Sequence, residues 1–342
     1  MKARVWMAVI TIAALLSAPF SFAADEKIGI FEVIYASSVS FEETTSALDE
    51  ALASSGLVLH AAHDVRVPED KHQARVYVLT SPTYADAAKG ESPRTISAQI
   101  LRIAVFTHGD EQKTYINMLN PVAYAMVFYS LSDNYDAMVA AAGNAADEIR
   151  TLVAAVPGEA KSFQQSPVRS EKQYRKYNGD GPAKMMAKWR NFEKSQLLIE
   201  EDTAENFDAV VERVATAITE SEVSGPDEST GWELVTRIQL RDDAVYLGIT
   251  NPFIEDRMVR INSRYRKSGK SDQSPYPGVD HVAALPTDVL ILKVDDETMV
   301  LHYGQMWRMQ LFFWDSGYRA FTANMGVPGD IAKSIEDTIN AE

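Results

Sequence analysis

Two stretches of sequence, Ile103-Ala104-Val105-Phe106 and Val289-Leu290-Ile291-Leu292, decide the fold class. Each is a short, continuous apolar run, and each is followed by an acidic pair, Asp110-Glu111 in the first case and Asp296-Glu297 in the second. Apolar runs of this length that are bounded by turn residues are typical of buried strands. The sequence therefore predicts a β-hairpin in each half of the chain.

The elements expected around the two hairpins follow a similar order in both halves. For the first half we expect a strand Ile28–Ala36, a helix Phe41–Ser54 with a Ser40/Glu43 capping box and Gly56 as C-cap, strands Leu57–Ala61 and Ala74–Leu79, hairpin strands Ile100–Phe106 and Thr114–Met118, and helices Val122–Leu131 and Tyr135–Val156. For the second half we expect a helix Glu205–Glu220, strands Trp232–Leu240 and Ala244–Ile249, hairpin strands Asp288–Val294 and Met299–Tyr303, and a last helix Ile331–Ile339 with Asp330 as N-cap. Either one unit was duplicated, which we favour, or two α+β halves share such fragments by chance.

The predicted fold class is α+β, because the elements come in blocks rather than in strict strand–helix–strand repeats. We expect two related domains, each an antiparallel-rich sheet with helices packed on one face. The expected boundaries are 24–156 for the first repeat and 195–342 for the second. Between them, residues 157–194 are rich in basic side chains and are expected to form a linker that ends in a short helix from Pro182. This segment is either a solvated linker or a basic arm that packs on an acidic surface.

Residues 1–23 have the features of a signal peptide. Two basic residues stand among the first four, an apolar run extends from Val5 to Leu16, and the small residues Ser21 and Ala23 precede a cleavage site. The run is shorter than the roughly 20 residues that a membrane-spanning helix needs, although an uncleaved anchor is the alternative. We therefore expect a mature chain that begins at Ala24, in a bacterial periplasm, with no integral membrane segment.

Charge and cysteine content exclude several classes of partner and cofactor. The chain has 342 residues, a formal net charge of −15 and no cysteine. An acidic surface repels phosphate backbones and anionic headgroups, so neither nucleic acid nor an anionic membrane is an expected partner. Without cysteine there is no thiol redox chemistry, no cysteine-ligated zinc, no iron–sulfur cluster and no covalent c-type haem. The sequence identifies no cofactor.

Three histidines, His60, His63 and His72, form the densest group of candidate metal ligands together with Asp64. On a continuous strand His60 and His63 would point to opposite faces, so only a turn between them would allow both to bind one ion. The alternative is that all three are surface histidines.

A second candidate site is the segment that contains His302, Tyr303, Trp307 and Arg308. These residues could line a ligand pocket with aromatic walls and a cationic anchor. A methionine near a histidine also suits copper(I) or an axial haem ligand. The alternative is that the segment is part of the core.

Thr250 and Asn251 are further candidate ligand-binding residues. They precede Pro252 at the end of a predicted strand, as Thr80-Ser81 precede Pro82 in the first half. Binding sites are often built at strand ends, but a proline also simply terminates a strand.

No catalytic motif is present. The sequence has no nucleophile elbow, no zinc-protease motif, no P-loop and no dinucleotide fingerprint, so we assign no catalytic residue. We predict an exported binding or accessory protein that holds a small ligand or a periplasmic protein partner. The alternatives are an enzyme whose site is assembled from scattered residues, with His302 and Arg308 as candidates, and a weak metal- or haem-binding protein.

Several of these segments carry a family resemblance. They are Ser40–Thr44, Ala51–Leu57, His63-Asp64, Ser81-Pro82 and Ile100–Phe106 in the first half, and Asn251-Pro252 and Leu285–Asp288 in the second. Together they resemble the bacterial family called domain of unknown function 302, in two tandem diverged copies that cover most of the mature chain. The resemblance implies a small α+β module, alone or paired, and it implies no reaction.

Overall fold

The computed structural model describes residues 26–68, 72–165, 169–175, 196–202, 206–265, 276, 278–294 and 297–341. The expected signal peptide, the short helix expected from Pro182 and the turn residues 295–296 lie outside these ranges. None of the helices in the described ranges combines the length and the apolar composition that crossing a bilayer requires.

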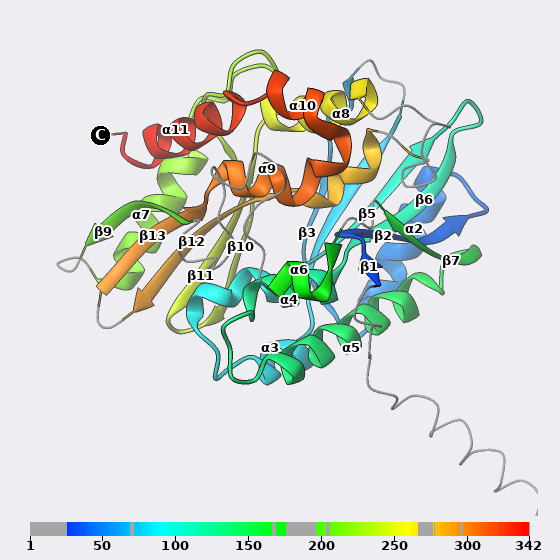
Figure 1. Cartoon of the computed structure of the whole chain (residues 1–342), viewed down its shortest axis with the longest axis horizontal. Helices are drawn as coiled ribbons and strands as arrows, with labels where there is room; N and C mark the ends of the chain where they lie inside the picture. Colours follow the sequence, from blue (N-terminus) through cyan, green and yellow to red (C-terminus); the bar gives the residue numbers. More distant parts are fainter. Residues whose placement is uncertain are drawn as a thin grey trace, which may run out of the picture.

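Two antiparallel sheets with helices around them form the α+β fold that the sequence predicts (Figure 1). The first half contains β2 (Phe31–Ser37), α2 (Phe41–Ala53), β3 (Val58–Asp64), β4 (Ala74–Thr80), α3 (Pro82–Ala87), the 3₁₀ helix η2 (Pro93–Gln99), β5 (Leu101–His108), β6 (Lys113–Leu119), α4 (Pro121–Phe128), α5 (Tyr135–Val153) and β7 (Gly158–Gln165). The second half contains β9 (Gln196–Asp202), α7 (Phe207–Thr219), β10 (Glu233–Arg241), β11 (Ala244–Thr250), α8 (Pro252–Tyr265), η5 (Val279–Ala284), β12 (Thr287–Val294), β13 (Glu297–Tyr303), α9 (Gln305–Phe313), η6 (Trp314–Ser316), α10 (Gly317–Ala323) and α11 (Val327–Ile339). A two-stranded sheet of β1 (Lys27–Ile28) and β8 (Arg169–Ser170), followed by α6 (Glu171–Arg175), completes the described elements.

The two large sheets share one strand order. In the first sheet the order is β3-β4-β5-β6-β2-β7, and in the second it is β10-β11-β12-β13-β9. Apart from β7, each strand of the first sheet therefore has a counterpart at the same place in the second. The strand β7 occupies the beginning of the segment that was expected to be a linker, and it pairs with β2.

The two halves pack against each other through their short 3₁₀ helices. The helix η5 of the second half contacts β4, β5 and β6, and η2 of the first half contacts β11 and β12. The edge strands β3 and β10 also meet. Helix α2 also contacts β5, and α7 also contacts β12. Both strands are buried along their whole apolar runs, which explains why Ile103–Phe106 and Val289–Leu292 show no alternation of apolar and polar residues.

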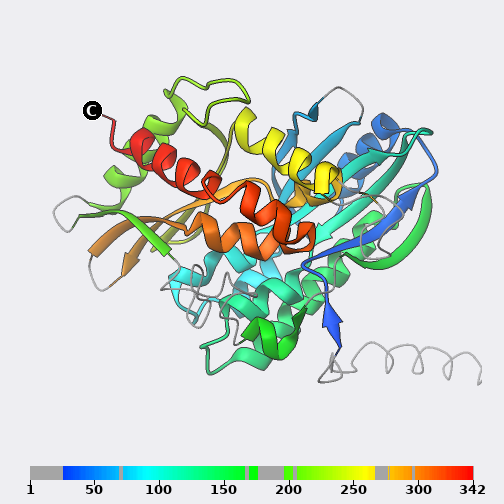
Figure 2. The ribbon, with the colours of Figure 1, turned by 45° about the horizontal axis from the view of Figure 1, so that its top comes forward.

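Helices of the two halves lie on opposite sides of the molecule in Figure 1, with α4 and α5 below and α8, α10 and α11 above. Figure 2 shows the C-terminal helices, drawn in orange and red, extending from the five-stranded sheet toward the first half. Phe312 of α9 contacts Phe31 of β2, with 5.7 Å between the ring centroids. The C-terminal helices thus take part in the contact between the halves.

Local signals at the helix ends were partly right. The predicted capping box is confirmed, because Ser40 Oγ accepts from the Glu43 backbone N–H at 3.2 Å and the Glu43 carboxylate accepts from the Ser40 N–H at 3.1 Å. The C-cap of this helix is Ser54 rather than Gly56. The last helix begins at Val327 instead of Ile331, since a proline in its first turn favours an earlier start and places Asp330 inside the helix.

Candidate functional site

The predicted ligand-binding residues Thr250 and Asn251 are buried at the junction between β11 and α8. Asn251 Oδ1 accepts from the Ile254 backbone N–H at 3.0 Å, so Asn251 satisfies an N–H group of the first helical turn. In the first half, Ser81 does the same for Tyr84 at the start of α3, at 3.2 Å. Each proline that was read only as a strand end therefore also begins a helix, for which proline is well suited at the first position.

The predicted residues His302, Tyr303, Trp307 and Arg308 come from β13 and α9, and all four are buried. The hydroxyl of Tyr303 donates to the Arg94 carbonyl of the first half at 2.9 Å. The ring of Trp307 lies 5.6 Å from that of Tyr303 and 5.9 Å from that of Phe128. The two aromatic residues of this segment therefore join the halves.

His302 is a neutral group inside the second half. Its Nδ1 lies 2.9 Å from the carbonyl oxygen of Tyr303, which requires the Nδ1–H tautomer as donor. Gln305 Nε2 donates to the same carbonyl at 3.1 Å, which directs Gln305 Oε1 toward Arg308. Burial lowers the pKa of His302 to about 4, with the nearby Arg308 charge as a smaller cause.

Arg308 is a buried cation that bonds only to neutral oxygens among the described residues. Its Nη1 donates to Thr287 Oγ1 at 2.8 Å and to Gln305 Oε1 at 3.3 Å, and its Nη2 donates to the Ala284 carbonyl at 3.0 Å. Burial lowers the pKa of Arg308, and the more distant Asp288 charge opposes this effect. An arginine nevertheless stays charged in proteins, so the positive charge is held here without an ion pair from the described part of the chain.

Arg308 lines a mostly apolar pocket between α8, α9 and α11. The cavity has a volume of about 50 Å³, and its other lining residues are Ile254, Arg257, Met258, Ile261, Gln305, Met309, Phe312, Phe313, Val327, Pro328 and Ile331. A second small apolar pocket shares Ile261, Met309 and Phe313 with it and continues toward Trp314 and Phe321. The lining of both pockets contains two arginines and no acidic residue.

Arg257 is the second cation of this pocket. Its guanidinium lies over the Phe253 ring, 5.0 Å from the centroid, and its buried Nε has no hydrogen-bond partner among the described residues. The next arginine of α8, Arg260, is different: its Nε bonds both carboxylate oxygens of Asp256 at 2.8 Å. Arg257 is therefore available to pair with an anion, whereas Arg260 is already paired with Asp256.

The corresponding place in the first half is built from different side chains. Two residues after the helix-starting proline, α3 has the fully buried Tyr84 where α8 has Ile254. At the position of Arg257, α3 ends with Ala87. The two arginines that lack an ion pair among the described residues therefore have no counterpart in α3.

A buried ion pair joins the two sheets. Arg102 of β5 and Asp288 of β12 are 0% and 1% exposed, and the Arg102 guanidinium bonds the Asp288 carboxylate. The hydroxyl of Tyr246 donates to Asp288 Oδ1 at 3.0 Å. Burial opposes the charged form of Arg102, but the Asp288 carboxylate and the neighbouring tyrosines outweigh it, so the pKa of Arg102 lies above its ordinary value. Because the two charges neutralise each other and both side chains are closed off from solvent, we interpret this cluster as structural, although Nε and Nη1 of Arg102 have no hydrogen-bond partner among the described residues.

The structure gives the three histidines predicted as metal ligands different neighbours. His60 bonds a threonine hydroxyl of β4 at 2.8 Å, whereas His63 bonds Glu255 of α8 at 2.7 Å. The ring of His72 lies 5.3 Å from that of His108. Within the described ranges, no group of three or more histidines and carboxylates is placed to bind a metal ion. The metal site stays a prediction from the sequence.

One further histidine has a geometry that is known from acid–base sites. His281 lies between two carboxylates, with Nδ1 at 3.0 Å from Asp280 and Nε2 at 3.3 Å from Asp315. However, the His281 side chain is 1% exposed and packs against Phe31 and Phe313. It therefore connects buried elements and does not face a cavity of the kind that a substrate needs.

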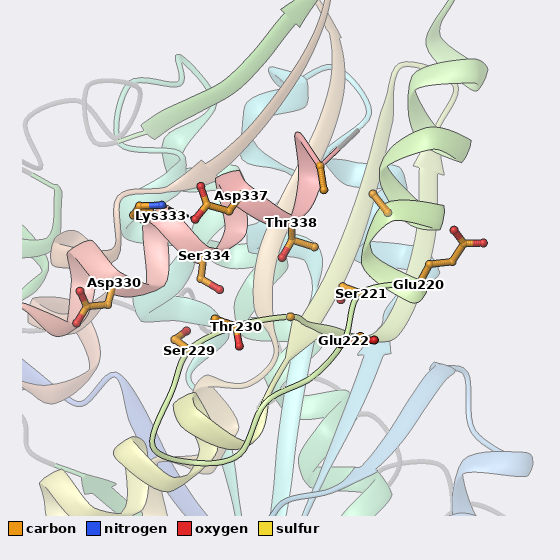
Figure 3. A pocket seen from close by; sticks show the side chains of 13 residues that line it. Glu220, Ser221, Glu222, Ser229, Thr230, Asp330, Lys333, Ser334, Asp337 and Thr338 are labelled. Carbon is orange, nitrogen blue, oxygen red and sulfur yellow. Dashed lines mark hydrogen bonds and ion pairs between the residues drawn. The ribbon is translucent and has the colours of Figure 1, made fainter.

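A broad cleft of about 680 Å³ lies between the end of α7, the loop before β10 and α11 (Figure 3). Its carboxylates include Asp330 and Asp337, and Asp337 bonds Lys333 on the same helix. The hydroxyl oxygen of Ser221 accepts from the Trp232 backbone N–H at 2.8 Å. The hydroxyl oxygen of Ser334 accepts from the Trp232 indole N–H at 3.0 Å. Because its charged groups are exposed to water, which screens their charges, this cleft offers less selectivity than the pocket between α8, α9 and α11.

Comparisons with family models, with curated proteins and with solved structures find no match to this chain. The pocket therefore has to be judged from its own chemistry. Sequence reasoning identified Arg308 but missed Arg257. A signal for it was present, because residues 257–270 contain six basic side chains and no acidic one in a chain of net charge −15.

Proposed function

We propose that this chain is an exported, periplasmic binding protein without catalytic activity, and that the pocket between α8, α9 and α11 binds the carboxylate end of a small apolar ligand. One observation carries the proposal. Two arginines without ion pairs among the described residues line an apolar pocket that contains no acidic residue. In a protein with a net charge of −15, this is a local preference for anions.

The chemistry of the two arginines favours a carboxylate. A buried charge without a counter-charge is costly, so an anion that enters the pocket gains from both guanidinium groups. The Nη atoms of Arg308 already donate to protein oxygens, which leaves Arg257 as the main free donor. A planar guanidinium matches the two oxygens of a carboxylate. A phosphate presents three strong acceptor oxygens, one more than this pairing satisfies.

The size and the walls of the pocket favour a short ligand. A volume of about 50 Å³ has room for roughly three water-sized groups, which is enough for the carboxylate and the carbon next to it. The adjoining apolar pocket offers further contact for a hydrocarbon chain, and Met258 and Met309 are flexible side chains that adapt to the shape of a ligand. Burial of each methylene group would contribute about 0.8 kcal/mol.

The order of five strands that the two sheets share supports a second proposal, which concerns the origin of the two halves. We propose that the two halves arose from one duplicated unit that resembles the domain of unknown function 302 family. On this proposal one copy retained a filled core around Tyr84, and the other acquired the pocket.

The test is a titration of the mature protein with hexanoate, followed by calorimetry and by thermal unfolding. Hexanoate should raise the melting temperature, because a ligand that binds only the folded state stabilises it. Hexanol and hexylamine, which have the same chain but no negative charge, should have a much smaller effect. Arg257→Met should weaken hexanoate binding by about tenfold or more, in line with the value of a charge-assisted hydrogen bond.

The matched control is Arg260→Met. Arg260 lies one turn further along α8, but it pairs with Asp256 and does not line the pocket. Its substitution should leave hexanoate binding unchanged. The proposal would be wrong if hexanol bound as well as hexanoate, or if the two arginine variants lost the same affinity.

A further inference from the structure

Glu255, near the start of α8, is a fully buried carboxylate at the contact between the two halves. Its side chain is 0% exposed. The hydroxyl of Thr250 donates to its Oε1 at 2.8 Å, and the Arg66 backbone N–H donates to its Oε2 at 2.8 Å. The Nε2 of His63 lies 2.7 Å from Oε1, and it acts as donor because an ionised carboxylate only accepts.

A fourth donor is Nη1 of the Arg66 guanidinium, 3.4 Å from Oε2, so three of the four donors belong to the first half. His63 is in β3 and Arg66 follows that strand, whereas Thr250 and Glu255 belong to the second half. The Arg66 guanidinium also pairs with Glu233 at the start of β10. The edge of the first sheet is therefore connected to α8 and to the edge strand of the second sheet.

The connection occurs on the helix that forms one wall of the ligand pocket. Glu255 follows Ile254 directly and precedes Arg257 by two residues, and both neighbours line the pocket. In the first half, the residue that corresponds to Glu255 is Ala85, three positions after Pro82. The buried carboxylate and the pocket thus occur together in the second half, and α3 carries no carboxylate at this position.

We propose that His63 and Arg66 are positioning residues for the ligand pocket, and that they act through Glu255 on the first turns of α8. This inference rests on the ligand site proposed above. A buried carboxylate that loses a donor is destabilised, so α8 keeps the position at which Glu255 meets β3. That position fixes the guanidinium of Arg257 at the pocket. By linkage, ligand binding and the docking of β3 on α8 stabilise each other.

The test compares hexanoate affinity, measured by calorimetry, in three variants of the full mature chain. His63→Ala removes a donor to Glu255 and should weaken binding by about tenfold, which lies within the usual range of coupling between two sites. His63→Gln keeps an N–H donor and should restore affinity to within about twofold of the wild type. His60→Ala is the matched control, because His60 lies on the same strand but bonds within the first half.

The outcomes separate the two proposals. If the wild-type protein does not bind hexanoate, the ligand site and its positioning fall together. If the wild type binds but His63→Ala and His60→Ala have equal affinity, only the positioning role is wrong. Should His63→Ala be unfolded by circular dichroism, Glu255→Gln tests the same contact, because its amide cannot accept from all four donors. Unchanged hexanoate affinity in that variant would also overturn the inference.

Discussion

The buried histidine of β13 predicts a specific dependence of stability on pH. His302 is 0% exposed, and burial lowers its pKa from 6.5 to about 4. The unfolded chain therefore takes up a proton at this site between pH 6.5 and pH 4, while the folded chain does not. The contribution to stability is complete above pH 6.5 and is lost as the pH falls to 4. One pH unit corresponds to about 1.4 kcal/mol, so the total loss is about 3 kcal/mol.

The test variant is His302→Met, because Met118 occupies the corresponding position in β6, one residue before the end of the strand. The free energy of unfolding is measured by urea denaturation at pH 7.5 and at pH 4.0 for both proteins. Other titrating groups affect both proteins alike and cancel in the comparison. The wild type should lose about 3 kcal/mol more than the variant. Parallel losses, equal to within about 0.5 kcal/mol, would refute the idea that His302 is held neutral by burial.

Three further predictions follow from other parts of the molecule. Arg102→Met leaves the Asp288 carboxylate buried without its partner and should cost about 3–5 kcal/mol in urea denaturation; a loss below 1 kcal/mol would contradict a tightly paired core. Ser40→Ala removes the cap of α2 and should cost about 1 kcal/mol in the same assay at pH 7.5, whereas an unchanged stability would contradict the capping role. Mass spectrometry of protein from a periplasmic fraction should give a chain that begins at Ala24, and a chain that retains Met1 would contradict export with cleavage.

Local sequence signals predicted most of the secondary structure. The Ser40/Glu43 capping box, the alternation of strands and turns and the two apolar runs each depend on residues that are neighbours in the chain. Short-range patterns of this kind can be recognised in the sequence without a structure. The α+β class and the antiparallel hairpins followed from them.

The helices after Pro82 and Pro252 were missed for a physical reason. A proline after a strand is consistent with strand termination alone, and the preceding Ser81 or Asn251 resembles a loop residue. The same residues also form an N-cap and a first helical position. The sequence pattern of a strand end is the same whether a loop or a helix follows. A helix as short as α3 adds too few apolar residues to reveal itself.

The candidate pocket was not predictable because its walls come from distant parts of the chain. Ile254 and Arg257 belong to α8, Arg308 belongs to α9, and Ile331 belongs to α11. Only the cationic anchor Arg308 was suggested by its own segment. The contact between His63 and Glu255 joins residues 192 positions apart, and no local pattern carries such a pairing.

The difference in length between α3 and α8 explains why only the second half has this pocket. Helix α3 has 6 residues and α8 has 14, although each starts at a proline after the same strand of its sheet. Met258 and Ile261 lie beyond the point at which α3 would have ended, and Arg257 lies at that point. The additional turns create a wall without a counterpart in the first half. The longer helix α8 is also connected to the first half, because His63 and the Arg66 backbone N–H bond the buried Glu255 carboxylate.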